Sequence, residues 1–104
     1  MYPAVLMFQP ELAASLMKYR FDRIPAAEAK AAGYISGPNH GLKGTMFPWQ
    51  SAMTGVECTP FFAGYGRDRE IHISGDIALA AWMYYTHGPS TELDWLRVVG
   101  FPLI

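Results

Sequence analysis

Apolar side chains recur at helical spacing near the start of the chain. Leu12, Leu16 and Tyr19 follow Pro10 at helical spacing, with Met17 beside them. Proline suits a first helical turn because the amide that it lacks would have no partner there. This pattern predicts an amphipathic helix over residues 10–20.

A second helix is predicted in an alanine-rich segment. Pro25 opens it, residues 26–32 are rich in alanine, and Gly33 stops it. The small side chains permit another helix to pack closely against this one.

Helical spacing returns in the second half of the chain. A longer helix is indicated by a set of apolar residues that ends at Gly88 and Pro89: Ile73, Ile77, Ala80, Ala81 and Tyr84. A last short helix is predicted with Ser90 or Thr91 as its cap and with these residues facing inward: Leu93, Leu96 and Val99. Gly100 and Pro102 are expected to follow it.

The segment from Tyr34 to Arg69 lacks helical periodicity. Glycine and proline recur through it, at Gly37, Gly41, Gly44, Gly55, Gly64, Gly66, Pro38, Pro48 and Pro60. Such a long irregular stretch is usually functional or disordered. Disorder is disfavoured by the large apolar residues, which are Tyr34, Met46, Phe47, Trp49, Met53, Phe61, Phe62 and Tyr65. The predicted class is all-α, with helical hairpins and one long ordered loop.

Composition changes this picture in one respect. Hydrophobic residues make up 51% of the 104 residues and charged residues only 16%. A small free-standing domain has a large surface to cover and normally has more charge. This composition predicts helices that pack against neighbours outside this chain, and a small but complete apolar domain is the alternative.

Charge and hydropathy exclude some partners. The net charge of −1 and the scattered basic residues give no reason to expect nucleic acid or an anionic membrane as partner. Residues 71–85 are too short and too polar to span a bilayer, and residues 1–8 do not resemble a signal peptide. Cys58 is the single cysteine and is expected to be a buried thiol. It mildly favours a reducing compartment, so we expect a cytoplasmic protein.

The densest candidate chemistry lies in residues 44–57. Sugar recognition needs an apolar ring against the C–H face of a pyranose and planar polar groups for its hydroxyls. Trp49 and Gln50, on a loop fixed by Pro48, supply both. Trp49 as a core aromatic that plugs the loop is an equal alternative.

Carboxylates and histidine offer weaker signals. A pair of carboxylates for glycoside hydrolysis could come from four residues, but surface or capping roles are favoured for each: Glu57, Asp68, Glu70 and Asp76. His72 and Asp76 share a helical face as possible metal ligands, yet a site needs a third ligand. A hydrogen-bond network at the helix start is the preferred explanation, and we expect neither a metal nor a cofactor.

Several ordered strings together resemble glycoside hydrolase family 65. They cover nearly the whole chain, at residues 18–20 (KYR), 29–34 (AKAAGY), 43–52 (KGTMFPWQSA), 54–57 (TGVE) and 70–77 (EIHISGDI). The resemblance implies an (α/α)6 barrel catalytic domain, of which residues 1–104 would form part, and inversion of configuration at an α-glucoside.

The resemblance also assigns roles to four residues as substrate-binding groups. Trp49 matches a tryptophan at the family's substrate subsites. Gln50 stands where the family usually has a glutamate that holds the sugar beyond the cleaved bond. Glu70 and His72 match a motif that opens the next barrel helix near the same subsites. Glu57 does not match the family's general acid, which belongs to a later motif, so no catalytic residue is expected in this chain.

The resemblance further suggests that the chain is an internal piece. Met1 resembles an internal methionine of the family, and the chain ends at Ile104 before the general acid. We therefore expect an inverting α-glucoside hydrolase, with a glucosyl-galactosyl-hydroxylysine glucosidase slightly preferred on the strings at residues 57–60 and 95–102. Its expected partners are an α-linked glucoside (a disaccharide or a glycosylated collagen-type peptide) and the remaining parts of the parent barrel. A disaccharide phosphorylase, a helical interaction module without sugar chemistry and a nonfunctional truncated product are the alternatives.

Overall fold

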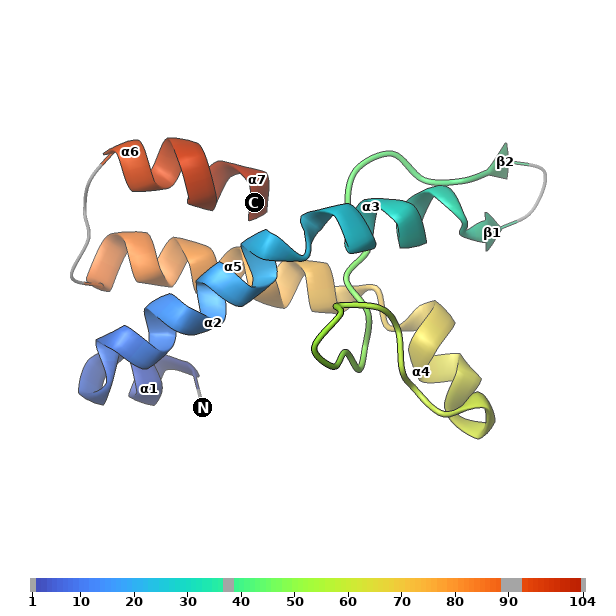
Figure 1. Cartoon of the computed structure of the whole chain (residues 1–104), viewed down its shortest axis with the longest axis horizontal. Coiled ribbons are helices and arrows are strands. Elements are labelled where there is room, and N and C mark those ends of the chain that lie inside the picture. Colours follow the sequence, from blue (N-terminus) through green and yellow to red (C-terminus); the bar gives the residue numbers. More distant parts are fainter. Residues whose placement is uncertain (1, 37–38, 89–92, 104) are drawn as a thin grey trace. The chain divides into compact units, whose positions relative to one another are not determined.

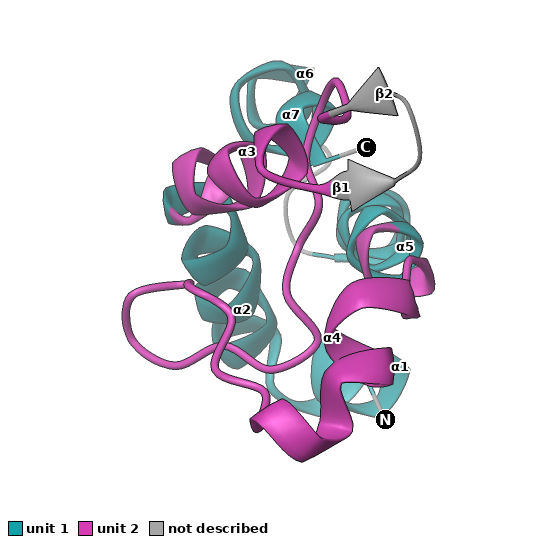
Figure 2. Ribbon diagram, turned by 90° about the vertical axis from the view of Figure 1, so that its right-hand side faces the viewer, with its two compact units in different colours: residues 1–22, 75–104 teal, residues 23–74 magenta. Residues whose placement is uncertain are grey.

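A computed structural model describes residues 2–36, 39–88 and 93–103. They form two compact units, one of residues 1–22 with 75–104 and one of residues 23–74 (Figure 2). The boundaries fall between successive helices after Asp22 and within a helix after Ser74. Each unit is described by itself.

Helices dominate the described residues, as predicted (Figure 1). The α-helices are α1 (Tyr2–Phe8), α2 (Pro10–Asp22), α3 (Ile24–Ala32), α4 (Gly64–Arg69), α5 (His72–His87), α6 (Leu93–Trp95) and α7 (Phe101–Leu103). A 3-10 turn, η1 (Phe61–Ala63), precedes α4, and a π-helical turn, η2 (Leu96–Gly100), joins α6 to α7. The strands are β1 (Ile35–Ser36) and β2 (Asn39–His40), an antiparallel pair with Ile35 opposite His40. No described helix is both long and apolar enough to cross a bilayer.

The first unit is built on α2, which contacts α1, η2 and α7. Its core is apolar and consists of Leu6, Ala13, Met17, Ile77, Ala81, Tyr84 and Leu103. The Tyr84 ring packs on the Trp95 indole at a centroid distance of 4.8 Å. The predicted bounds of the helix over residues 10–20 and of the helix ending near Gly88 are confirmed within a few residues.

The buried side of α2 agrees with the predicted stripe at Met17 and differs from it at Leu12 and Leu16. Ala13 and Met17 are buried, whereas Leu12 and Leu16 are substantially exposed. Apolar residues occupy both sides of this helix, so spacing alone could not decide which side faces the core. Helix α1 was not predicted, because an almost wholly apolar segment shows no periodicity.

The end of the chain also differs from the prediction. Gly100 and Pro102 lie inside the last helical segment instead of after it, and Leu93 is exposed. The amide of Phe101 bonds to the carbonyl of Leu96, five residues back. This wider π turn disrupts the α pattern just where a proline would clash with it, so the segment continues through Pro102. The proposed caps Ser90 and Thr91 and the stop at Pro89 lie outside the described residues.

The second unit is organised by α3. Its buried residues Ala27 and Ala31 accept hydrogen bonds at their carbonyls from the amides of Met46 (3.0 Å) and Leu42 (2.8 Å). Within this unit, α3 is therefore bonded to the extended segment that contains Leu42 and Met46. Gly33 ends α3, as predicted.

The predicted irregular loop is shorter than expected. The strands β1 and β2 and the helical segments η1 and α4 interrupt residues 34–69. The glycines at 64 and 66 have low helix propensity, so the sequence did not predict α4. What remains irregular, residues 41–60, contains the buried residues Met46, Phe47 and Thr59.

Candidate sugar-binding site

The loop that bears Trp49 and Gln50 is closed on itself like a small hairpin. The Cys58 amide donates to the Gln50 carbonyl at 2.9 Å, and Ser51 pairs with Glu57 in an isolated antiparallel bridge. The turn at its tip needs Gly55, whose φ of +76° is strained for other residues. A Cβ there would also collide with the Arg23 side chain, 2.5 Å away.

Arg23, just before α3, fastens the tip of this loop. Its guanidinium donates to the carbonyl of Met53. At the base of the loop, the Phe47 amide donates to the Ser74 hydroxyl at 3.2 Å, and this hydroxyl lies 3.4 Å from the Thr45 carbonyl. The loop is thus held at both ends by residues of its own unit.

Glu57 is the main polar anchor of the loop. Its carboxylate accepts hydrogen bonds from the backbone amides of Trp49 (3.1 Å), Gln50 (3.2 Å) and Thr59 (3.2 Å). The Thr59 hydroxyl and the Lys30 ammonium (2.5 Å) also donate to it. A carboxylate with this many donors is a structural anchor.

The ion pair with Lys30 is largely shielded from solvent. The Lys30 and Glu57 side chains are 17% and 11% exposed, against 73% and 41% in the surface pair of Lys18 with Asp22. Burial by itself raises the pKa of Glu57, but the hydrogen bonds from Lys30, Thr59 and the Gln50 and Trp49 amides outweigh it and lower this pKa to about 2. A glycosidase acid needs a raised pKa, so Glu57 is unsuited to donate a proton.

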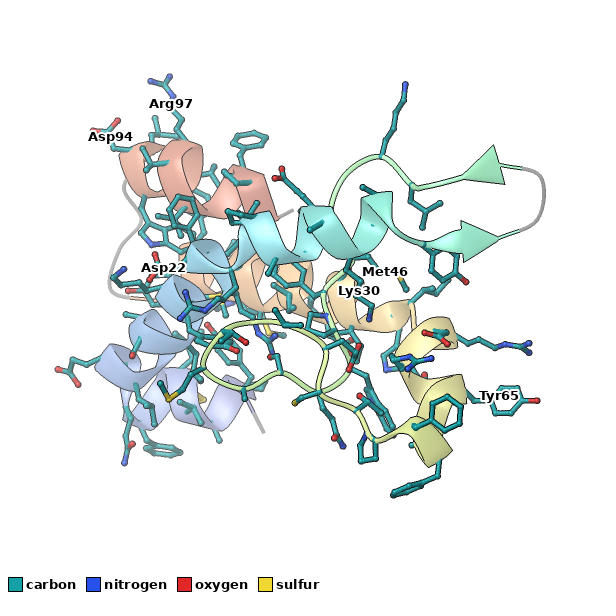
Figure 3. The ribbon with its side chains drawn as sticks, turned by 45° about the vertical axis from the view of Figure 1, so that its right-hand side comes forward. Asp22, Lys30, Met46, Tyr65, Asp94 and Arg97 are labelled. Atoms are coloured by element: carbon teal, nitrogen blue, oxygen red, sulfur yellow. The ribbon has the colours of Figure 1, made fainter. Side chains whose placement is uncertain are left out.

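Lys30 connects the loop to α4. The same ammonium that pairs with Glu57 donates to the Arg67 carbonyl at 3.0 Å. Figure 3 shows its side chain reaching from α3 toward the loop. One atom, Lys30 Nζ, therefore binds both the loop and α4.

Trp49 lies against α4 at Gly66. A Cβ at Gly66 would fall 2.2 Å from Cε3 of the indole, so only glycine leaves room for the ring. The Trp49 side chain remains 40% exposed. It therefore does not plug the core of the loop, and part of the ring is open to a ligand. Gln50 is also exposed.

Glu70 and His72 form the second predicted pair. His72 Nδ1 lies 3.0 Å from Glu70 Oε2 where α5 begins, and both side chains are about half exposed. The Glu70 amide donates to the Gly66 carbonyl at 3.2 Å. Gly66 thus contacts Trp49 with its Cα and holds Glu70 with its carbonyl, so one turn of α4 links the two pairs.

The carboxylates that the sequence offered as a catalytic pair have separate partners. Asp68 binds the Arg67 guanidinium through two bonds of 2.8 and 2.9 Å, which lower the pKa of Asp68. Glu57 binds Lys30, and Glu70 binds His72. Among the described residues no group of three metal-ligating side chains occurs. The favoured surface role fits Asp68 and Glu70, whose side chains are 51% and 42% exposed, but not Glu57, which is largely shielded.

Aromatic side chains project beside the candidate site. Phe61, Phe62 and Tyr65 are 88%, 90% and 75% exposed and line a surface hollow with Arg67 and Arg69. The Arg69 guanidinium lies 4.8 Å from the Tyr65 ring centroid, and Figure 3 shows Tyr65 extending away from α4. The sequence placed these aromatics in the ordered loop and did not predict their exposure.

Two further residues differ from the sequence expectations. Cys58 is exposed instead of buried. Gly66 was counted as a loop breaker, but it makes room for the indole. No local signal in the sequence could show this, since the partner is a distant residue.

A comparison with protein families decides the class of enzyme. Residues 1–103 match the model of the glycosyl hydrolase family 65 central catalytic domain. The chain belongs to glycosyl hydrolase family 65. The resemblance seen in the sequence is thereby confirmed, and so is the assignment of an all-α fold that forms part of the family 65 barrel.

Relatives in family 65 cover the whole chain. It is 42% identical over 104 residues to a kojibiose hydrolase from Flavobacterium johnsoniae, covering 100% of this chain and 14% of the relative. It is 42% identical over 102 residues to a protein-glucosylgalactosylhydroxylysine glucosidase from Dictyostelium discoideum, covering 97% and 14%. A kojibiose phosphorylase from Caldanaerobacter subterraneus is 32% identical over 113 residues, covering 100% and 14%. The chain thus spans about one seventh of the length of these relatives.

Proposed function

We propose that this chain forms part of the sugar-binding site of an inverting α-glucoside hydrolase. The supporting observation is the half-open Trp49 indole next to Gln50 on an anchored loop. An aromatic ring beside a planar amide suits a pyranose, which offers an apolar face and a rim of hydroxyls. We call the side chains of Trp49 and Gln50 the sugar platform.

Glu70 and His72 extend the sugar platform in this proposal. Their side chains lie 3.0 Å apart where α5 begins, and the Gly66 carbonyl accepts the Glu70 amide from the helix on which Trp49 rests. Paired in this way, the two side chains present preset polar atoms to sugar hydroxyls at little entropic cost. In the inverting reaction, a general acid protonates the leaving oxygen while a base-activated water attacks the opposite face of the sugar.

We place both catalytic groups outside residues 1–104, in the remaining parts of a longer catalytic domain. Exposed apolar side chains support this proposal, because the remaining parts of the domain could cover them. They include Phe8, Leu12, Leu16, Phe61, Phe62, Ile71 and Phe101. A cytoplasmic location remains a prediction of the sequence alone.

An α-linked glucoside is the proposed substrate class. Hydrolases named for kojibiose and for glucosylgalactosylhydroxylysine share 36–42% of the aligned residues with this chain, and two kojibiose phosphorylases share 32% and 36%. This difference favours hydrolysis, with glucosylgalactosylhydroxylysine slightly preferred on the sequence strings noted above.

The test is an activity assay on the complete coding region and on the 104-residue chain. The complete protein is expected to release glucose from kojibiose or glucosylgalactosylhydroxylysine without phosphate, and proton NMR should show the β-anomer first. The isolated chain should release none. Strict dependence on phosphate with formation of glucose 1-phosphate would assign a phosphorylase, and absence of both products and of sugar binding would leave a helical interaction module.

A further inference from the structure

We propose that Glu57 is a positioning residue for sugar binding, which sets the orientation of the sugar platform through the backbone of Trp49 and Gln50. The inference rests on the proposed function of these two side chains. Glu57 itself is 11% exposed and bonded on both oxygens, so it is not offered as a group that touches the sugar.

Each carboxylate oxygen of Glu57 accepts a hydrogen bond from a different residue of the platform. Oε2 accepts the Trp49 amide at 3.1 Å, and Oε1 accepts the Gln50 amide at 3.2 Å. The two amides are consecutive in the chain, so bonding both to one rigid group fixes the peptide plane between them. The directions in which the Trp49 and Gln50 side chains leave the backbone are then fixed as well.

Lys30 extends this control to the surface on which the indole rests. Its ammonium binds Glu57 Oε2 at 2.5 Å and the Arg67 carbonyl at 3.0 Å. Arg67 follows Gly66, the residue in contact with the indole. The carboxylate thus sets the platform from the backbone side, and Lys30 sets α4 against the face of the ring.

The chemistry of the anchor requires a charged carboxylate. Every partner of Glu57 in the cluster is a donor, and a glutamine replaces one acceptor oxygen with a donating NH2 group. Glutamine in one orientation loses Lys30 and the Trp49 amide, and in the other it loses Gln50 and both Thr59 donors. Glu57→Gln therefore keeps the volume of the side chain but releases part of the platform in either orientation.

The test compares KM with kcat in the complete enzyme, with kojibiose as the probe. A sugar contact that is present in both ground and transition states affects KM, so Glu57→Gln is expected to raise KM about tenfold and to change kcat less than about twofold. A merely structural role would reduce the amount of active enzyme and leave its KM unchanged. Asp22→Asn is the matched control, since it also replaces the carboxylate of a lysine ion pair by an amide, and should leave both constants unchanged.

An unchanged KM in folded Glu57→Gln would overturn the proposal. If this variant does not fold, Glu57→Asp takes its place, because it keeps the charge that pairs with Lys30 but withdraws the carboxylate by one methylene from the Trp49 and Gln50 amides. It should raise KM about threefold, and an unchanged KM would again overturn the proposal.

Trp49→Ala separates this inference from the proposed function. A raised KM in Trp49→Ala together with an unchanged KM in Glu57→Gln refutes the positioning role alone. An unchanged KM in Trp49→Ala refutes the sugar platform, and the inference falls with it.

Discussion

The dependence of the unfolding free energy on pH below 5 provides the sharpest test of the Glu57 anchor. The pKa of Glu57 falls from 4.5 to about 2 on folding, because its hydrogen-bond donors outweigh the effect of burial. Between these two values the unfolded chain binds a proton that the folded chain does not, so protonation favours unfolding. The contribution of Glu57 is therefore complete above pH 4.5 and is lost as the pH falls toward 2.

The size of this contribution follows from the shift. A change from 4.5 to about 2 corresponds to roughly 3 kcal/mol, of which about 2 kcal/mol should be lost by pH 3. Little discount for solvent screening applies, since the side chain is only 11% exposed. In Glu57→Gln this part of the pH dependence is absent, and the other titrating groups cancel when the two proteins are compared.

The assay is urea unfolding of the wild-type chain and of Glu57→Gln at pH 7, 5, 4 and 3. Both proteins contain 5-fluorotryptophan, and the fluorine resonance of Trp49, assigned with Trp49→Phe, reports on residues 23–74. The difference in unfolding free energy should stay constant from pH 7 to 5 and shrink by about 2 kcal/mol at pH 3. A difference that remains constant down to pH 3 would refute the low pKa, and one that shrinks above pH 5 would refute its sign.

Other predictions address packing. Gly66→Ala should destabilise residues 23–74 by about 1–3 kcal/mol in the same assay, because the added methyl group collides with the Trp49 ring. The control is Gly75→Ala, whose methyl group has no atom within 4 Å and should stabilise α5 by about 0.5–1 kcal/mol. An equal effect of both would contradict the packing. Met17→Ala should cost about 2–5 kcal/mol by thermal or urea unfolding and Leu12→Ala less than about 1 kcal/mol, and the reverse order would restore the side of α2 predicted from spacing. Ultraviolet titration should show a phenol of pKa about 12 that Tyr2→Phe removes, since burial and then the charge of a neighbouring tyrosine raise this pKa.

Helix positions were predictable where the sequence has capping residues and a single apolar stripe. Pro10, Pro25 and Gly33 mark helix ends that the structure reproduces within a few residues. Helix α2 shows the limit of such reasoning, since Ala13 and Met17 form one apolar stripe and Leu12 and Leu16 another. Spacing does not rank two apolar faces; the neighbouring elements do.

The residues of the candidate site remain a prediction from the sequence, and the groups that support them could not be predicted from it. Trp49 and Gln50 stand out because their chemistry suits a sugar. The supports are distant in sequence, since Lys30 precedes Glu57 by 27 residues and Gly66 contacts an indole from another segment. The residues next to Lys30 and Gly66 in the sequence give no indication that these two contact Glu57 and the Trp49 indole.

The exposed thiol of Cys58 has a practical consequence. It is the single cysteine of the chain, and its amide is bonded to the carbonyl of Gln50, so it sits at the base of the hairpin that bears the sugar platform. Maleimide chemistry can therefore attach one spin label or fluorophore there without any engineered site. A probe at this exposed position would register movement of the hairpin as sugars are titrated.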